Sequence, residues 1–101
     1  PDTDRETVMT ARDAATLASN IIKDHPDYTR FTTIQSYKFR PTDKAPIINY
    51  NWMLEANKNI TNFRKFAYPG LDGMKTGHTS NAGNCFTGTA ERNGMRLISV
   101  V

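Results

Sequence analysis

The sequence predicts a small mixed α/β (α+β) domain in which an antiparallel sheet packs with helices. Residues 10–24 carry apolar side chains at helical spacing, which indicates a helix with one buried face. Near the end, an Asn-Gly pair joins two runs of β-type residues, which is a strong signal for a hairpin. The chain has 101 residues, of which 38% are apolar. That is room for one domain, and too apolar a composition for a disordered chain.

The predicted helix starts at Thr10 and ends before His25-Pro26. The Thr10 hydroxyl can accept a backbone N–H in the first turn, where the negative charge of Asp13 also suits the helix dipole. Pro26 disfavours the helical conformation of the residue before it. One face of the helix is apolar and consists of Ala11, Ala14, Ala15, Leu17, Ala18, Ile21 and Ile22.

The middle of the chain is less regular. Clusters of β-branched and aromatic residues favour strands there, and prolines and polar residues favour turns. In order, we expect short extended segments at 31–34 and 36–39, a turn between Pro41 and Pro46, a short helix opening at 49–54 and a polar loop at 57–62.

The pattern of glycines and β-type residues in residues 70–101 predicts three strands. The first runs extended through 74–76, between Gly70, Gly73 and Gly77. The other two cover 84–91 and 95–101, because Asn93 and Gly94 both tolerate the positive φ that a tight hairpin needs. Residues 97–101 are apolar except for Ser99 and are expected to be buried on both faces of the sheet.

Composition excludes several classes of site. Cys85 stands alone, so neither an internal disulfide nor a thiolate metal cluster is expected, and His25 and His78 lack metal-ligand spacing. The net charge of +3 falls in residues 55–101, but its basic residues form no run, so we expect no nucleic-acid partner. No stretch has the length of a membrane span, and no signal peptide or initiator Met is visible. The chain is therefore expected to be processed or cut from a longer protein.

The triplet Lys75-Thr76-Gly77 carries the best chemical signal. An ammonium beside a hydroxyl can bind a carboxylate, and Gly77 lets another backbone approach closely. On an edge strand, the free N–H groups could pair with an extended peptide and point at a carbonyl oxygen. Three residues alone are a weak signal, and without further context an ordinary solvated strand that carries Lys and Thr is the preferred interpretation.

The surrounding residues add a family resemblance. Residues 70–101 closely resemble D-alanyl-D-alanine carboxypeptidases of the low-molecular-mass penicillin-binding class (serine peptidase family S11). The resemblance covers nearly the whole chain in the right order. It is carried by Met9-Thr10-Ala11-Arg12-Asp13, Asp24-His25-Pro26-Asp27-Tyr28, Asn49-x-Asn51-x-x-Leu54, Asp72-Gly73, Lys75-Thr76-Gly77-His78-Thr79, Ala82-Gly83 and Gly94-Met95-Arg96-Leu97-Ile98-Ser99-Val100.

The resemblance implies part of a β-lactamase/transpeptidase-like fold and a penicillin-sensitive acyl-serine enzyme that trims peptidoglycan stem peptides. By that match, Lys75 supplies positive charge in catalysis and binding, and Thr76 binds the terminal carboxylate of D-Ala-D-Ala. Gly77 leaves clearance for the peptide, and the backbone N–H of His78 is an oxyanion-hole donor. β-Lactam antibiotics are implied ligands, and no metal or organic cofactor is implied.

The chain departs from the family in lacking Ser-x-x-Lys and Ser-x-Asn, because neither pattern starts at its serines, Ser19, Ser36, Ser80 and Ser99. Residues 1–101 are therefore expected to be the later, C-terminal portion of a catalytic domain, inactive alone. The resemblance places the parent protein outside the cytoplasm, associated with the cell envelope and membrane. A homodimer of the 101-residue chain is also expected.

Two other functions stay open: a related enzyme of the serine β-lactamase superfamily, and a non-catalytic binding module with a vestigial Lys-Thr-Gly strand. For single residues, simple structural roles are preferred. Asp72 is expected to form a turn rather than brace the strand, and Cys85 to be a small buried hydrophobe. The aromatic side chains are expected to serve packing, namely Trp52, Tyr28, Phe31, Tyr37 and Phe39.

Overall fold

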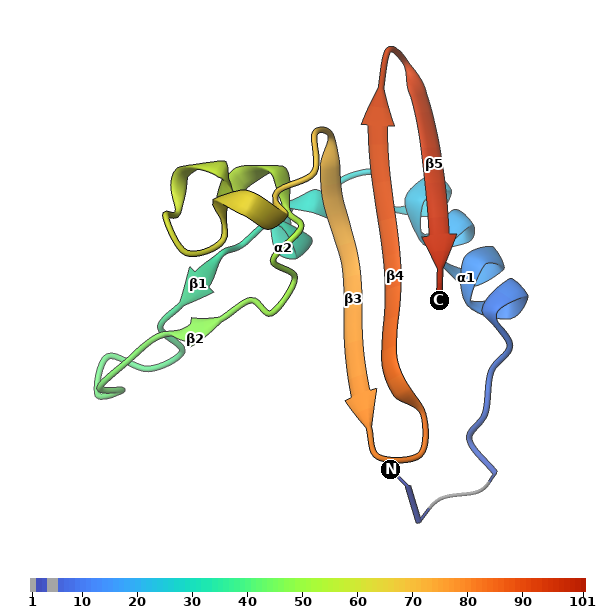
Figure 1. Cartoon of the computed structure of the whole chain (residues 1–101), viewed down its shortest axis with the longest axis horizontal. Coiled ribbons are helices and arrows are strands. Elements are labelled where there is room, and N and C mark those ends of the chain that lie inside the picture. The colour runs from blue at the N-terminus through green and yellow to red at the C-terminus, as the bar shows by residue number, and fades with distance from the viewer. Residues whose placement is uncertain (1, 4–5) are drawn as a thin grey trace.

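The computed structural model describes residues 2–3 and 6–101, and it confirms a mixed fold of helices and antiparallel sheet (Figure 1). Strands β3, β4 and β5 form one antiparallel sheet in that order, and β1 and β2 form a separate two-stranded ribbon. The elements are α1 (Ala11–Asp24), α2 (Thr29–Thr32), β1 (Ser36–Tyr37), β2 (Ile47–Ile48), the 3-10 helices η1 (Glu55–Asn59) and η2 (Arg64–Phe66), β3 (Leu71–Thr79), β4 (Gly83–Arg92) and β5 (Met95–Val100).

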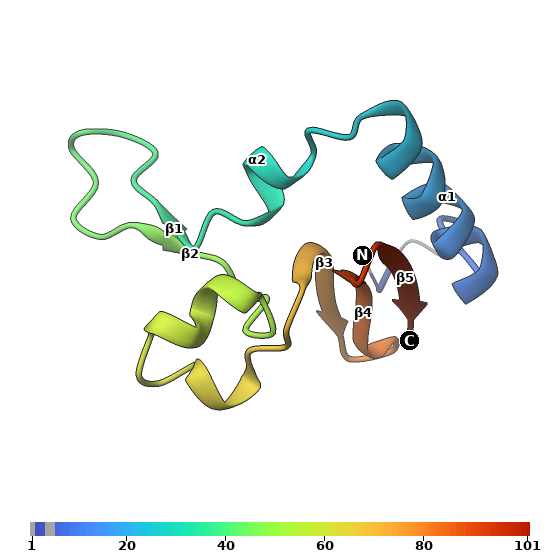
Figure 2. The ribbon, with the colours of Figure 1, turned by 90° about the horizontal axis from the view of Figure 1, so that it is seen from above.

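Helix α1 confirms the expected boundaries. The backbone N–H of Asp13 donates to Thr10 Oγ1 at 3.0 Å, so Thr10 is the N-cap, and His25 ends the helix outside helical geometry. Its half-buried face lies over one face of the sheet, where it packs on β5 and β4 (Figure 2). No helix in the described part of the chain has the length and apolar character needed to cross a membrane.

The β4–β5 hairpin is also confirmed. Asn93 and Gly94 have φ values of 53° and 76°, as a two-residue turn between antiparallel strands requires, and the strands continue from the pair Arg92 and Met95. Burial along β5 contradicts the expectation. Its side chains alternate between half-buried and exposed, and Leu97 is 67% exposed. In the part of the chain that the structure describes, α1 covers one face of β5 and the other face stays exposed.

The expected strand at 31–34 is wrong, because residues 29–32 form the single helical turn α2. The hydroxyls of Thr32 and Thr33 donate to the carbonyls four residues earlier, which supports helical geometry. Thr32 Oγ1 also makes a 2.7 Å contact with the carbonyl oxygen of Asp72, forty residues away. A tertiary contact has therefore overridden local strand propensity. The second expected segment forms only at β1, paired with β2, and the turn flanked by Pro41 and Pro46 lies between them.

The expected helix opening at 49–54 is also wrong, since the helical turn η1 begins at Glu55. Asn49 and Asn51 each accept, through Oδ1, the N–H two residues ahead, and these local turns compete with a helix. Asn57 is not in an exposed loop but is 2% exposed. Its amide donates to the carbonyls of Asn51 and Trp52 and accepts from Gln35.

Two glycines offer a matched test of the sheet. Gly70 has φ +83°, and an added Cβ would lie 2.3 Å from the carbonyl oxygen of Glu91, whereas Gly94 has φ +76° with nothing near its Cβ position. We expect Gly94→Ala to lower the free energy of unfolding by about 1–2 kcal/mol through backbone strain alone. Gly70→Ala should lower it by more, because the β3–β4 contact must also shift. Urea denaturation followed by circular dichroism measures both, and equal losses would contradict this geometry.

Candidate functional site

The predicted site residues lie together on the outer strand of the sheet. Lys75, Thr76, Gly77 and His78, hereafter the β3 wall, are consecutive in β3 and face Thr87, Phe86, Cys85 and Asn84 of β4. Within residues 2–3 and 6–101, β4 is the only strand paired with β3. Among the described strands, β3 is therefore at the edge of its sheet, which is the condition for the peptide pairing considered from the sequence.

The register shows which backbone groups point to this free edge. Phe86 exchanges both of its backbone hydrogen bonds with Val101, at 3.0 and 2.9 Å, so its N–H and C=O face β5. Backbone direction alternates along a strand, so the neighbours of Phe86 face β3, opposite Lys75 and Gly77. The N–H and C=O groups of Thr76 and His78 therefore point outward, away from β4.

The side chains of the β3 wall are accessible. Lys75, Gly77 and His78 are exposed, and Thr76 is half-buried. The Lys75 ammonium donates to the carbonyl oxygen of Thr76, as expected if that carbonyl faces outward. His78 Nδ1 lies 2.9 Å from Asn84 Oδ1, and since that oxygen can only accept, Nδ1 donates the proton. The imidazole is thus tied to β4 while the backbone N–H of His78 stays free.

A hollow of about 610 Å³ opens beside the β3 wall. Its other side is aromatic and apolar and consists of Tyr50, Trp52, Met53 and Phe66. Trp52 stacks on Phe63 at 5.4 Å between ring centroids and lies against Phe66, but it is also 42% exposed and lines the hollow, so packing is only part of its role. Within residues 2–3 and 6–101, no Asp or Glu lines this hollow, and Lys75 brings a positive charge to it. An anionic group therefore meets favourable charge there.

Two asparagine side chains, Asn49 and Asn57, hold the facing segment in place, and neither role was predicted from the sequence. The side-chain amide of Asn49 donates to the carbonyls of Thr32 and Ile34 at 3.1 and 2.9 Å. The side-chain amide of Asn57 donates to the backbone carbonyls of Asn51 and Trp52, both at 3.1 Å. The backbone N–H of Tyr68 donates to the carbonyl of Met53 at 2.9 Å, which ties the end of this segment back to its start. These bonds place the aromatic side of the hollow next to β3.

Two expectations about single residues are wrong. Cys85 is exposed rather than buried, because its side chain stands opposite Gly77, which offers no side chain to cover it. Tyr28 is buried as expected, but three other aromatics are exposed at 59–72%, namely Phe31, Tyr37 and Phe39. Phe31 lies on α2, and Tyr37 and Phe39 lie on or next to the β1–β2 ribbon, which forms a sheet separate from β3–β5.

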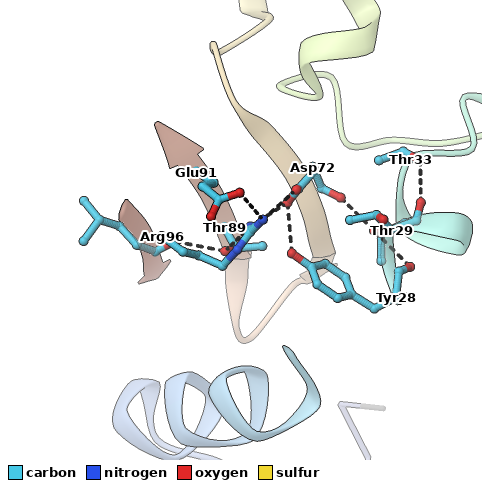
Figure 3. A network of polar contacts seen from close by, with 9 residues as sticks. Tyr28, Thr29, Thr33, Asp72, Thr89, Glu91 and Arg96 are labelled. Carbon is cyan, nitrogen blue, oxygen red and sulfur yellow. Dashed lines mark hydrogen bonds and ion pairs between the residues drawn. The ribbon is translucent and has the colours of Figure 1, made fainter. Parts of the chain in front are cut away.

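Asp72 braces the strand instead of forming a turn, and Figure 3 shows how. Its two carboxylate oxygens accept from Arg96 Nη1 and Nη2 at 2.9 and 3.0 Å, and Tyr28 Oη donates to the same carboxylate at 3.1 Å. Arg96 Nη1 also donates to Thr89 Oγ1, and Arg96 Nη2 lies 3.6 Å from a Glu91 carboxylate oxygen. Neither Arg96 nor Thr89 was predicted as part of the site, because their contacts with Asp72 form only when the three strands come together in the fold.

This network changes two pKa values. Burial, followed by the nearby negative charge of Asp72, raises the pKa of Tyr28 to about 12. The hydrogen bonds from Arg96 to Asp72 raise the pKa of Arg96 above its ordinary value. Both groups therefore keep their protons over the whole physiological range. Among the described residues, no three His, Cys, Asp or Glu side chains gather as a metal site would require.

The sequence profile of D-alanyl-D-alanine carboxypeptidases, peptidase family S11, matches residues 2–101. A D-alanyl-D-alanine carboxypeptidase of Bacillus subtilis strain 168, DacF, is 39% identical over 92 residues, which are 90% of this chain and 21% of that protein. DacA of Haemophilus influenzae is 38% identical over 90% of this chain and 20% of its own length. The chain thus spans about a fifth of the length of these relatives.

Solved structures agree. The peptidoglycan synthesis regulatory factor PBP3 of Streptococcus pneumoniae superimposes with a TM-score of 0.74 at 35% identity, over 92% of this chain and 23% of that one. Penicillin-binding protein D2 of Listeria monocytogenes, in its ampicillin-bound form, gives 0.70 at 35% identity, over 97% and 36%. The fold is therefore that of penicillin-binding, transpeptidase-like domains.

The raised pKa of Tyr28 predicts a loss of stability at high pH. Above about pH 10 the unfolded chain loses the phenol proton first, so the free energy of unfolding should fall as pH rises from about 10 to 12, by at most about 2–3 kcal/mol. Tyr28→Phe should remove this part of the pH dependence. The difference between the ultraviolet titrations of the two proteins gives the Tyr28 curve, and a midpoint near 10 would contradict the prediction.

Proposed function

The chain belongs to the D-alanyl-D-alanine carboxypeptidase family, and on this premise we propose that the protein carrying it is a serine-type D-Ala-D-Ala carboxypeptidase. Its substrate would be the stem peptide of peptidoglycan. The observation that carries the proposal is the free edge of β3, where the N–H groups of Thr76 and His78 point outward beside the Lys75 ammonium. In this proposal, the chain supplies a binding wall and a separate part of the protein supplies the nucleophile.

The β3 wall would hold the end of the substrate in extended form. The peptide pairs with the outer edge of β3, and Gly77 gives its backbone room. The terminal carboxylate accepts from the Thr76 hydroxyl and is attracted by the Lys75 ammonium. The scissile carbonyl oxygen then lies at the N–H of His78, which would stabilise the negative charge that develops there.

The chemistry would proceed through an acyl-serine. A serine outside this chain adds its oxygen to the carbonyl carbon, and the serine proton passes through a base to the leaving amine. The C–N bond breaks and releases D-alanine. Water then adds to the ester, which frees the serine and leaves the shortened peptide as a carboxylate. No step in this sequence calls for a metal or an organic cofactor.

β-Lactam antibiotics would bind to the same wall. A β-lactam carries a carboxylate near its reactive carbonyl, as the end of D-Ala-D-Ala does. Its carboxylate would therefore bind Thr76 while its carbonyl oxygen lies at the N–H of His78. The similar Listeria protein has been solved in ampicillin-bound and cefotaxime-bound forms, which supports this ligand class. No nucleic-acid partner is part of the proposal.

The same premise supports a place for the chain in the whole protein. Residues 1–101 would be the later, C-terminal portion of the catalytic domain, after the segments that carry Ser-x-x-Lys and Ser-x-Asn. Because peptidoglycan lies outside the cytoplasmic membrane, the protein would act there, associated with the envelope through parts outside this chain.

Acylation by a labelled penicillin tests the proposed wall. In the full-length protein, Thr76→Val keeps the shape of the side chain but removes a hydrogen bond to a charged carboxylate. The acylation rate should therefore fall about 10- to 100-fold. Thr76→Ser restores the hydroxyl and should stay within a few-fold of the unaltered protein. The 101-residue chain alone should not be labelled. Equal rates for Val and Ser at position 76 would sink the proposed role, and an unlabelled full-length protein would sink the function.

We also propose that the isolated chain pairs with a second copy through β5. The outer edge of β5 is unpaired within the described residues, and Met95, Leu97 and Val101 are 65–74% exposed beside it. Antiparallel pairing of two β5 strands would bury these side chains.

Sedimentation equilibrium at tens of micromolar should show a dimer that Leu97→Lys shifts toward monomer. Ile47→Lys is the matched control, since Ile47 is exposed to a similar extent on β2. A monomer throughout, or an equal effect of both variants, would count against this dimer.

A further inference from the structure

We propose that Arg96 and Asp72 are positioning residues that set the placement of the β3 wall. The inference rests on the proposed function, and it concerns residues that the proposed reaction does not touch. Asp72 precedes Lys75 by three residues on β3, about 10 Å along an extended strand, so its ion pair acts on the wall through the backbone.

The ion pair has a geometry suited to holding a strand. The Arg96 guanidinium contacts both carboxylate oxygens, at 2.9 and 3.0 Å, which fixes the direction of the Asp72 side chain as well as its distance. Arg96 belongs to β5, and β4 lies between the two strands. The pair therefore spans the full width of the sheet and ties its free edge to its opposite side (Figure 3).

Neighbouring side chains hold both partners. Thr89 of β4 is 1% exposed, and its hydroxyl accepts from Arg96 while donating to the carbonyl of Leu97 at 3.0 Å. On the other side, Tyr28 Oη donates to Asp72 and the Arg96 guanidinium carbon lies 5.7 Å from the Tyr28 ring centre. The network is thus satisfied from β4 and from the segment that leads into α2.

The backbone at this point leaves the strand little freedom. The pairing register of β3 with β4 shifts between Leu71 and Gly73, so Asp72 sits in an irregularity of the ladder. Gly73 is buried, and a Cβ there would lie 3.4 Å from both Thr89 and Tyr28. An irregular ladder does not fix the direction of the next residues by itself. The side-chain bonds of Asp72 and the bond from Thr32 to its carbonyl do so instead.

The wall needs such control because β3 is paired on one side only. The outward N–H groups of Thr76 and His78 have no partner strand to align them within the described residues. A shift of about 1 Å in a group that binds the reacting carbonyl can cost about 100-fold in rate. The network would therefore affect the rate of reaction more than the affinity for substrate.

The test uses the full-length protein with Arg96→Lys, which keeps the charge but replaces the two-pronged contact by a point charge. We expect kcat for a D-Ala-D-Ala peptide to fall about 10- to 100-fold with KM changed less than three-fold, and penicillin acylation to slow in parallel. Hydrogen exchange should rise in the peptide that covers β3. The matched control is Arg40→Lys, whose ion pair with Asp43 at 3.2 Å is exposed in a distant loop. It should stay within two-fold.

If Arg96→Lys does not fold, Tyr28→Phe takes its place. This variant removes a single bond to Asp72, and we expect a two- to five-fold loss of kcat with the same exchange signature. A variant that lowers the melting temperature but leaves kcat, acylation and exchange at β3 unchanged would overturn the inference. Failure of the unaltered protein to react with penicillin would overturn the proposed function instead, while the exchange experiment would still decide whether the network orders β3.

Discussion

The carboxylate of Asp72 is the point at which the separate parts of this structure meet. It lies on β3, is held by Arg96 from β5, and accepts a hydrogen bond from the Tyr28 hydroxyl ahead of α2, while the backbone carbonyl of Asp72 accepts one from Thr32. A partly buried charge is costly unless its oxygens are satisfied, so these partners must be in place together. That requirement couples α2, the order of the three strands and the start of β3. Removing one partner would leave the others poorly satisfied, which makes the network cooperative.

The outer edge of β3 has backbone groups that no strand of the described chain pairs with. In an antiparallel pair, the N–H and C=O groups of successive residues point to opposite sides of the strand. Those of Lys75 and Gly77 point toward β4, and those of Thr76 and His78 point outward. The wall therefore offers donors to a ligand without breaking any bond within the sheet. A strand edge that is to bind a peptide has no partner strand on its outer side. Its position must then be held by its pairing within the sheet and by side-chain contacts near its start, such as those of Asp72.

Little apolar surface is buried in the rest of the molecule. Among the described residues, four apolar side chains are less than a tenth exposed, namely Ala18, Tyr28, Leu54 and Leu71, while large apolar side chains remain exposed on β5. Polar bonds carry much of the organisation in the middle of the chain, where Asn49 and Asn57 hold the aromatic side of the hollow through backbone carbonyls. Directional bonds can place a segment where little apolar surface is available to bury.

Local chemistry by itself determined the helix from Thr10 to its end at His25, the Asn93-Gly94 hairpin and the β3 wall as a motif, because caps, positive-φ turns and strand alternation depend on neighbouring residues. The single turn of α2, the burial of Asn57 and the exposure of Cys85 were decided by contacts distant in sequence. The same is true of β5, whose apolar run carries no mark of which face is covered. Asp72 shows most clearly what local sequence cannot predict. Its position beside a glycine indicates a turn residue, and only the fold brings Arg96 of β5 past β4 to bind its carboxylate.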